Sequence, residues 1–210
     1  MKNIDNIRTN YSFARLTKSM LSLSPINQFK KWFGELSHVD DFNAMILSTY
    51  NYDEGVNNRV VLLKEVTHTG FVFYTNYASL KGRQIDANNK VALCFFWPAF
   101  QRQVRINGVA IKVPKEKSDI YFNQRPRESQ IAAWISLQSE IITKREDFEK
   151  KCTVMELKFK NKKIPRPDFW GGYEVVPYSV EFWQGRANRM HDRFLYQKKD
   201  NKWIVNRLAP

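Results

Sequence analysis

The amino-acid sequence predicts an α+β domain whose mainly antiparallel β-sheet closes into a small barrel. Three observations support this fold class. Runs rich in β-branched and aromatic residues follow one another near both ends of the chain, helical periodicity is concentrated between them, and strands do not alternate regularly with helices. This lack of alternation disfavours a parallel, Rossmann-like sheet. Neither a G-x-G-x-x-G motif nor a P-loop occurs among the eight glycines, so any bound phosphate is expected to be held by side chains.

The first elements expected along the chain are helical. Residues 4–16 show a weak helical pattern, and a loop follows. Ser24 is a good helix N-cap, and Pro25 suits the first turn of a helix. Apolar residues then recur at helical spacing, namely Ile26, Phe29, Trp32, Phe33 and Leu36.

The remaining elements are mostly strands, with helices grouped in the middle of the chain. Strands are expected over residues 44–50, 58–66, 71–75, 91–97, 103–113, 173–176, 180–183, 193–197 and 203–208. Turn residues over 51–55 and a hairpin over 67–70 connect the early strands. Helices are expected over residues 80–87, 115–123, 130–135 and 144–160.

Length and charge bound the organisation and the partners. A chain of 210 residues suits a single domain over residues 1–210, with residues 1–22 as a flexible N-terminal segment. The formal net charge of +13 indicates an anionic partner, which could be a nucleic acid, a membrane surface or a phosphorylated small molecule. The densest basic cluster, residues 158–166, is interrupted by apolar residues and is better explained as a solvated helix end than as a nucleic-acid patch.

The two cysteines and the N-terminus indicate a cytoplasmic protein. Cys94 lies in an apolar run, and neither Cys94 nor Cys152 has a Cys or His at metal-binding spacing, so no metal site and no disulfide are expected. The N-terminus lacks the apolar stretch of a signal peptide, and no run of about 18 apolar residues could cross a membrane.

The first group of candidate functional residues begins in the strand expected over 58–66. Arg59, Val61 and Leu63 share one face of that strand, and Val60, Leu62 and Lys64 share the other. A cation at each end of an apolar strand suits an anion at the rim of a barrel, and the hydroxyls of Tyr74 and Thr75 could come from the next strand. Charged residues that merely flank a buried strand explain this pattern equally well.

The second group surrounds a proline. Tyr121, Arg125 and Ser129 are spaced by four residues, but Pro126 prevents a regular helix there. A sharp turn with arginines and a serine at a helix start offers a guanidinium, a hydroxyl and free backbone N–H groups to a phosphate. The alternative is an ordinary helix start with arginines that face solvent.

The third group follows a Phe-Trp-Gln-Gly run at residues 182–185. If residues 189–193 are extended, Arg189, His191 and Arg193 project to one side and Asp192 to the other. Two cations beside a histidine with no carboxylate on the same face need an anion to balance them. The alternative, surface charges around a satisfied histidine, is weaker here than at the other two groups.

Taken in order, these segments resemble one family. The strings RVVLLK, GFVFYTN, RQV, YFNQRPRESQIAAW, SLQS, FWGG, FWQG, RMHDRFLY and NRLAP follow one another as they do in the pyridoxine/pyridoxamine 5'-phosphate oxidases. The resemblance covers nearly the whole chain. It implies an FMN-binding split β-barrel with surrounding helices, and a homodimer with FMN at the subunit interface.

The resemblance also implies roles for individual residues. The expected FMN ligands are Arg59, Val60, Val61, Leu62, Leu63, Lys64, Tyr74, Thr75, Lys81, Gln103, Gln138, Ser139, Trp183 and Arg193, some of them from the partner chain. The substrate would be bound by Arg8, Tyr11, Lys64, Tyr121, Arg125, Ser129, Arg189 and His191, of which Arg189 and His191 are the expected catalytic residues over the substrate ring. Other tryptophans, Trp170 among them, are expected in the core or at the dimer interface.

One position departs from the family pattern. The family commonly has Arg-Lys where this chain has Leu80-Lys81, so a guanidinium that would face the FMN phosphate is missing, and Arg83 is a candidate replacement.

The implied reaction is the oxidation of pyridoxamine or pyridoxine 5'-phosphate by O2 to pyridoxal 5'-phosphate, through FMN, with release of hydrogen peroxide and, from the amine, ammonia. Two alternatives stay open at this point. A flavin carrier would share the fold without the substrate residues, and a nucleic-acid-binding protein would explain the charge, although no recognised nucleic-acid motif is present.

Overall fold

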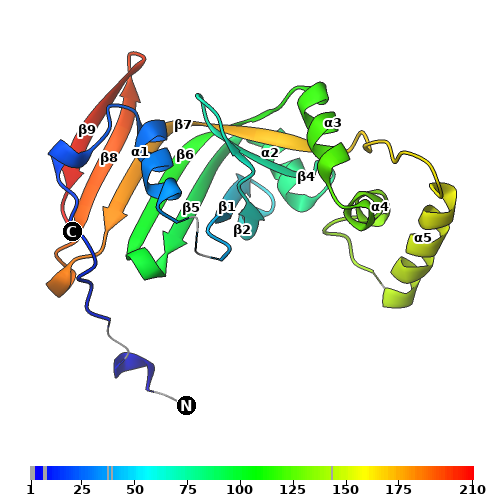
Figure 1. Cartoon of the computed structure of the whole chain (residues 1–210), viewed down its shortest axis with the longest axis horizontal. Coiled ribbons are helices and arrows are strands. Elements are labelled where there is room, and N and C mark those ends of the chain that lie inside the picture. Colours follow the sequence, from blue (N-terminus) through cyan, green and yellow to red (C-terminus); the bar gives the residue numbers. More distant parts are fainter. Residues whose placement is uncertain (1–2, 7–8, 37, 39, 143) are drawn as a thin grey trace.

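The computed structural model describes residues 3–6, 9–36, 38, 40–142 and 144–210, and is shown in Figure 1. A nine-stranded antiparallel sheet forms its centre. Seven strands follow the order β2-β1-β5-β6-β7-β4-β3, and the other two, β8 and β9, branch from β7. The strands are β1 (Ala44–Asn51), β2 (Gly55–Leu62), β3 (Glu65–Val66), β4 (Phe71–Asn76), β5 (Lys90–Trp97), β6 (Arg102–Lys112), β7 (Trp170–Gln184), β8 (Asp192–Lys199) and β9 (Lys202–Leu208). The helices are α1 (Pro25–Gly34), α2 (Leu80–Ala87), α3 (Lys115–Gln124), α4 (Arg127–Ile135) and α5 (Arg145–Lys158).

The long strand β7 joins the two halves of the sheet. One edge of β7 pairs with β6 along its length, and the other edge pairs first with β4 and then with β8, which in turn pairs with β9. The sheet curls, and a short connection after β2 brings its first edge to its last. In this connection Leu63 donates its N–H to Asn43 beside β1, and Lys64 donates its N–H to Val72 in β4. The predicted α+β class and split barrel are confirmed.

The helix predicted over residues 4–16 is wrong. Among the described residues of this stretch, Ile4–Asn6 forms a 3₁₀ turn and residues 9–16 contain no helix. Distant side chains take the backbone N–H groups that a helix would have used. The N–H of Phe13 binds Gln101 Oε1 at 3.0 Å, and the N–H of Leu16 binds Asp192 Oδ2 at 3.1 Å. Tertiary contacts thus override a weak local preference.

Other predicted elements are correct in kind but differ in their bounds. The single strand predicted over 58–66 is split, because the chain changes partners between Leu62 and Glu65. The two strands predicted over 173–176 and 180–183 are one strand, β7. A register shift between Asn107 and Gly108 lets Tyr178 bulge out, so the strand continues past Pro177. The helix predicted from residue 130 begins at Arg127, directly after Pro126.

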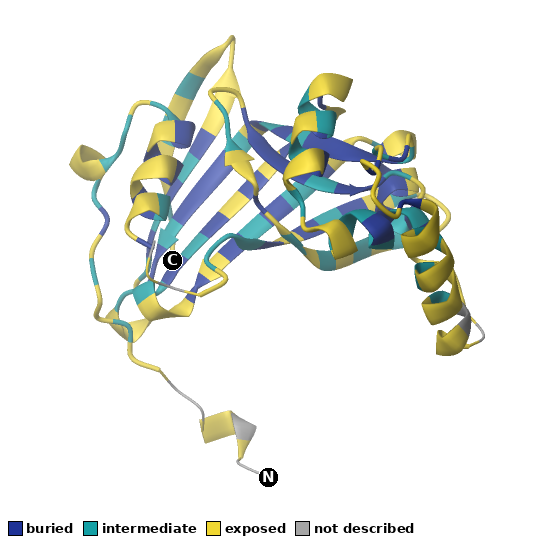
Figure 2. Cartoon of the chain, turned by 45° about the vertical axis from the view of Figure 1, so that its right-hand side comes forward, coloured by how far each residue is buried: buried dark blue, intermediate teal, exposed yellow. Residues whose placement is uncertain are grey.

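Helix α1 fills the concave face of the sheet with aromatic side chains. Phe29 is fully buried and meets Phe71 and Phe95, with ring centroids 4.8 and 5.0 Å apart. Trp32 packs edge-to-face on Phe182 at 5.2 Å. Figure 2 shows this buried stripe along the strands, while the outer turns of the helices are exposed. In the described part of the chain, no helix is long and apolar enough to cross a membrane.

A second, smaller core lies beyond the end of the sheet that carries β4. There Phe122, Ile131 and Trp170 pack between α3, α4 and β7. This cluster fixes the two helices against the sheet, and their junction forms one wall of the cavity described below.

Replacing Phe29 with Ala should lower the free energy of unfolding by about 3–5 kcal/mol, because the residue is buried on all sides by other rings. The measurement is urea denaturation followed by circular dichroism. The control is Leu23→Ala, whose side chain is 96% exposed and whose loss should cost less than about 0.5 kcal/mol. Equal effects of the two changes would contradict the proposed central place of α1 in the core.

Candidate active site

A cavity of about 950 Å³ opens between the sheet edge formed by β2 and β4 and the helices α2, α3 and α4. Its volume is at the upper end of the range for small-molecule sites, about 300–1,000 Å³. Most residues that the sequence singled out are brought together here. The cavity is lined by Arg59, Val60, Val61, Leu62, Lys64, Tyr74, Thr75, Lys81, Tyr121, Arg125, Ser129, Gln138 and Ser139, together with residues not singled out for the site, such as Ser136 and Trp170.

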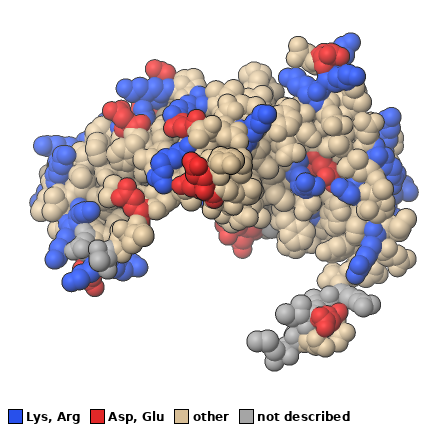
Figure 3. Space-filling model, turned by 180° about the vertical axis from the view of Figure 1, so that it is seen from behind, with Lys and Arg blue, Asp and Glu red and all other residues tan. Residues whose placement is uncertain are grey.

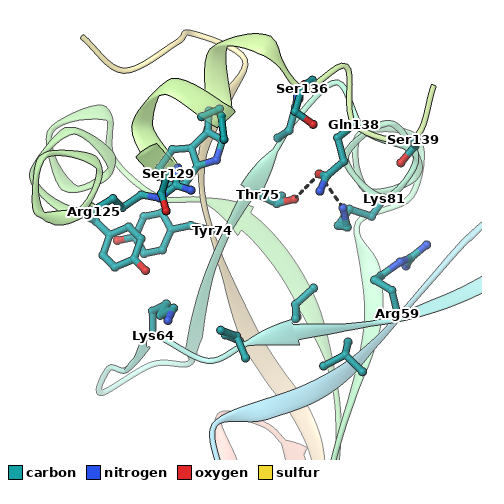
Figure 4. Close-up of a pocket in the computed structure, with 18 of the residues that line it drawn as sticks. Arg59, Lys64, Tyr74, Thr75, Lys81, Arg125, Ser129, Ser136, Gln138 and Ser139 are labelled. Carbon is teal, nitrogen blue, oxygen red and sulfur yellow. Dashed lines mark hydrogen bonds between the residues drawn. The ribbon is translucent and has the colours of Figure 1, made fainter. Parts of the chain in front are cut away.

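One end of the cavity is built around Lys81 and Gln138 (Figure 4). Lys81 Nζ donates to Gln138 Oε1 at 3.0 Å and to Ser79 Oγ at 3.2 Å, and Thr75 Oγ1 donates to the same Gln138 oxygen at 3.4 Å. Burial, and then the neighbouring charge of Arg59, lower the pKa of Lys81 to about 8. An anion at this end would relieve both effects.

Helix α2 adds its N-terminus to this end. Ser79 caps the helix by accepting the N–H of Gly82, and a helix N-terminus carries a partial positive charge. Only glycine fits at residue 82, because a Cβ there would collide with the backbone of Tyr77. Leu80 lines the cavity. Arg83 does not replace the missing guanidinium, since it is exposed, is not part of the lining and donates to Ala78 O at 2.7 Å.

The opposite end of the cavity carries Lys64, Tyr121, Arg125 and Ser129, as Figure 4 shows for the three of them that it labels. The Arg125 guanidinium lies 4.6 Å above the ring of Trp170. Its Nη1 is buried without a hydrogen-bond partner in the described part of the chain, and burial lowers its pKa. A buried, unpartnered guanidinium N–H is costly, and an anionic ligand would satisfy it.

Aromatic rings form the wall between these residues and the sheet. Tyr121 stacks on Tyr74 at 3.9 Å with an interplanar angle of 12°, and the parallel ring of Trp170 lies beside this pair, with its centroid 5.6 Å from Tyr74 and 6.2 Å from Tyr121. Burial, and then the charge of Glu65, raise the pKa of Tyr74 to about 12, so its hydroxyl stays protonated at neutral pH. Trp170 was expected only as a core or interface residue. Its neighbours Gly171 and Gly172 are the sequence signal for close packing at this position, because a Cβ at either glycine would collide with side chains, those of Tyr77 and Tyr74 among them.

Between the two cationic ends the lining is apolar. Val60 and Leu62 on β2 are exposed towards solvent, and Ala132 and Ala133 on α4 line the same cavity. Leu63 faces the core, as strand alternation requires, so its side chain does not line the cavity. A cavity with two cationic ends and an apolar middle suits flat ring systems that carry anionic groups at separate places.

The remaining predicted residues form a second cluster at the far end of β7. Trp183 lies between Gln103 on β6 and Arg193 on β8, and the ring of His191 is 4.6 Å from that of Trp183. None of these residues lines the cavity. Trp170 and Trp183 are separated by most of β7, which at about 3.3 Å per residue corresponds to a distance of up to roughly 40 Å. The two clusters therefore do not meet within one chain.

The loop before β8 differs from the prediction. Residues 189–193 are not extended together, because Asn188 and Arg189 have positive φ angles of 55° and 61° and β8 begins only at Asp192. His191 Nδ1 accepts the backbone N–H of Arg186 at 3.1 Å, so the neutral ring carries its proton on Nε2. Burial, followed by the charges of Arg193 and Arg189, lowers the pKa of His191 and favours this neutral form.

The N-terminal segment lies across the second cluster. The ring of Tyr11 packs edge-to-face on that of Trp183, with centroids 5.7 Å apart. A Cβ at Gly185 would come within 2.8 Å of the Tyr11 ring. Arg8, which was expected beside Tyr11, lies outside the described residues. Two carboxylates for which the sequence predicted no role in the site stabilise this region. Asp192 pairs with Arg186 and Arg207, and Glu181 pairs with Arg193 at 2.8 Å and Arg105 at 3.1 Å.

Comparison with known proteins adds an independent finding. Residues 36–160 match the family model described as pyridoxamine 5'-phosphate oxidase, and residues 170–210 match the one described as the pyridoxine 5'-phosphate oxidase C-terminal dimerisation region. Two relatives named pyridoxine/pyridoxamine 5'-phosphate oxidase come from Leptospira biflexa and Haemophilus influenzae. The first is 45% identical and covers 100% of both chains, and the second is 47% identical and covers 99% of both.

Solved structures agree on the fold. The crystal structure of PhzG from Burkholderia lata, in complex with tetrahydrophenazine-1-carboxylic acid, superimposes with a TM-score of 0.86 over 91% of this chain and 95% of that one, at 24% identity. A pyridoxamine 5'-phosphate oxidase-related, FMN-binding protein from Nostoc punctiforme gives a TM-score of 0.70 over 90% of this chain and 100% of that one, at 16% identity. At these identities the likeness concerns the fold.

The Lys81 ammonium group should titrate near pH 8 in the ligand-free protein, because burial and Arg59 both disfavour its charged form. NMR of protein labelled with ¹³C and ¹⁵N at lysine measures this pKa, and Lys81→Gln assigns the signal. In Arg59→Met the pKa should rise, since one of the two causes is removed. A signal that titrates at the ordinary lysine value in both proteins would refute the described environment of Lys81.

Proposed function

Because the chain belongs to the pyridoxine/pyridoxamine 5'-phosphate oxidase family, we propose that it oxidises pyridoxamine and pyridoxine 5'-phosphates with O2 to pyridoxal 5'-phosphate, in the salvage and biosynthesis of vitamin B6. The alcohol and O2 give the aldehyde and hydrogen peroxide, and the amine reaction also consumes water and releases ammonia. The observation that carries the proposal is the cavity with two cationic ends and an apolar middle, which suits a phosphorylated cofactor beside a phosphorylated substrate.

The residues at the Lys81 end fit the phosphate of FMN. Arg59, Lys81 and the N-terminus of α2 converge there, and the depressed pKa of Lys81 reflects a site without a counter-charge from the protein. The apolar residues 60–62 of β2 and the side chains of Tyr74, Thr75, Gln138 and Ser139 would hold the flavin ring. When bound, FMN supplies the two-electron redox chemistry that no side chain provides.

The residues at the Arg125 end fit the phosphate of the substrate. Arg125 offers a buried N–H without a partner in the described chain, and Lys64 adds a second cation. Tyr121 and Ser129 add hydroxyl groups. By fixing the phosphate, these four side chains orient the pyridine ring for reaction, so much of their contribution is positional.

The catalytic residues Arg189 and His191 are proposed to act from the partner subunit of a homodimer. Their cluster does not reach the cavity of its own chain, and residues 170–210 match a dimerisation region. An apolar face is available for such contact, since Ile46, Val60 and Phe96 are exposed on neighbouring strands. Gln103, Trp183 and Arg193 would complete the flavin site in the same way, and Tyr11 and Arg8 would cover the substrate.

The chemistry proposed for this cluster is electrostatic. Arg189 is exposed and cationic, and His191 presents an Nε2–H donor because Arg186 occupies Nδ1. Both groups would hold the substrate ring and stabilise charge that develops on it. Neither is required to remove a proton.

The charge of the chain also fits a phosphorylated small molecule. Figure 3 shows Lys and Arg spread over one face of the molecule with acidic residues among them, rather than gathered into one stripe as on a nucleic-acid-binding surface. A net charge of +13 raises the local concentration of anionic substrates. We further propose a cytoplasmic location, which the free thiols of Cys94 and Cys152 support because reducing compartments keep cysteines unpaired.

The proposed activity predicts a reversible change in the visible spectrum. The purified protein loaded with FMN should bleach when pyridoxamine 5'-phosphate is added without oxygen, and the flavin absorbance should return when air is admitted. Pyridoxamine without the phosphate is the control and should bleach the flavin far more slowly, because the Arg125 end would be empty. A flavin that binds but stays oxidised with the phosphorylated substrate would favour a flavin carrier over an oxidase.

Sites shared between subunits predict complementation. Arg125→Met and Arg189→Met should each abolish most turnover. After unfolding and refolding together, random pairing should restore roughly a quarter of wild-type turnover, because about half of the dimers then carry one intact site. The readout is hydrogen peroxide formation, and each variant refolded alone is the control. If the mixture stays inactive while wild type refolds well, Arg125 and Arg189 act in the same chain.

A further inference from the structure

A chain of buried polar groups connects Arg59 to helix α2. Arg59 Nη1 donates to Thr49 Oγ1 at 2.6 Å, and Thr49 Oγ1 donates to Gln84 Oε1 at 2.5 Å. Thr49 is 1% exposed and Gln84 is 0% exposed. Neither residue lines the cavity, so neither can touch a ligand there.

The available hydrogen atoms determine which group donates and which accepts in each of these hydrogen bonds. A threonine hydroxyl has one hydrogen, and Thr49 gives it to the Gln84 oxygen, so its lone pairs are free to accept from Arg59. Arg59 Nη1 also donates to Asn57 O at 3.2 Å and to Leu47 O at 3.3 Å. The N–H groups on Nε and Nη2 of Arg59 have no partner in the described chain. Those groups are left for an anion in the cavity that Arg59 lines.

The same helix positions both cations at this end of the cavity. Helix α2 carries Lys81 in its first turn and Gln84 one turn later, so Lys81 belongs to α2 directly and Arg59 is tied to α2 through Thr49. A free arginine side chain has many rotamers, and fixing one of them in advance removes an entropic cost from ligand binding. This matters more here because Leu80 brings no charge and Arg83 is turned away.

We propose that Thr49 and Gln84 are positioning residues for the phosphate of FMN, because they hold Arg59 by its Nη1 and leave its Nε and Nη2 N–H groups ready for that anion. The inference rests on the proposed function, since it takes FMN as the cavity ligand. The competing explanation is that the hydrogen bond between Thr49 on β1 and Gln84 on α2 only stabilises the fold.

A comparison of FMN with riboflavin, which lacks the phosphate, separates the two explanations. The apoprotein is titrated with each flavin, and flavin fluorescence gives the dissociation constants. Thr49→Val keeps the shape of the side chain but removes the hydroxyl. It should weaken FMN binding about tenfold, as expected for loss of a hydrogen bond to a charged group, and should leave riboflavin binding within about twofold.

Two further variants complete the design. Thr49→Ser keeps the hydroxyl and should bind FMN almost as wild type does. Thr153→Val makes the same chemical change at an exposed position on α5 and should change neither affinity. In an Arg59→Met background Thr49→Val should have little further effect on FMN, because its action passes through Arg59.

The possible failures are distinct. If wild type does not bind FMN, the proposed function fails. If wild type binds FMN and Thr49→Val binds it equally well, the positioning role is wrong. If Thr49→Val weakens the binding of FMN and of riboflavin by the same factor, Thr49 and Gln84 only stabilise the fold and the proposal is overturned.

Discussion

The pairing of β7 with three other strands is the constraint on which the rest of the structure depends. Because one edge of β7 pairs first with β4 and then with β8, the two halves of the sheet share a single strand. The same strand carries Trp170 at one end, under the guanidinium of Arg125, and Trp183 at the other, beside His191. The distance between the two functional clusters is therefore set by the sheet. A site that needs both clusters has to be assembled from two chains, as we propose.

Three cationic side chains that line the cavity are buried or partly buried. Burial lowers the pKa of Arg59, Lys81 and Arg125 alike, which means that folding places these groups where their charged forms are poorly solvated. A protein would avoid this arrangement if stability were the only requirement. An anion would stabilise these charged forms in place of solvent, so we propose that the unfavourable electrostatics of the cavity become binding energy for phosphorylated ligands.

Local patterns in the sequence predicted much of the fold and part of the cavity, and the resemblance to the family added the roles of Lys81, Gln138 and Ser139. Strand alternation predicted that Arg59 and Val61 share one face of β2 and that Val60 and Leu62 share the other, and Pro126 predicted the break that places Arg125 and Ser129 at a helix start. The errors arose where distant partners decide. The segment around Phe13 is held open by Gln101, and the pattern of residues 4–16 contains no trace of that contact. The pairings of Asp192 and Glu181, and the separation of the two clusters, likewise depend on topology rather than on spacing along the chain.

The departure at Leu80 changes which residues can form the proposed FMN phosphate site within a fixed fold. Without a guanidinium in the first turn of α2, the proposed phosphate-binding end has one cation fewer, and Arg83 does not replace it because Arg83 donates to a backbone carbonyl. What remains is a helix terminus, Lys81 on that helix, and Arg59 tied to it through Thr49 and Gln84. All three depend on the position of α2. Since Gly82 packs α2 closely against the backbone of Tyr77, the helix has little freedom to shift. A single closely packed helix can thus hold Lys81 and Arg59 in place, where the family commonly has a further arginine at the position of Leu80.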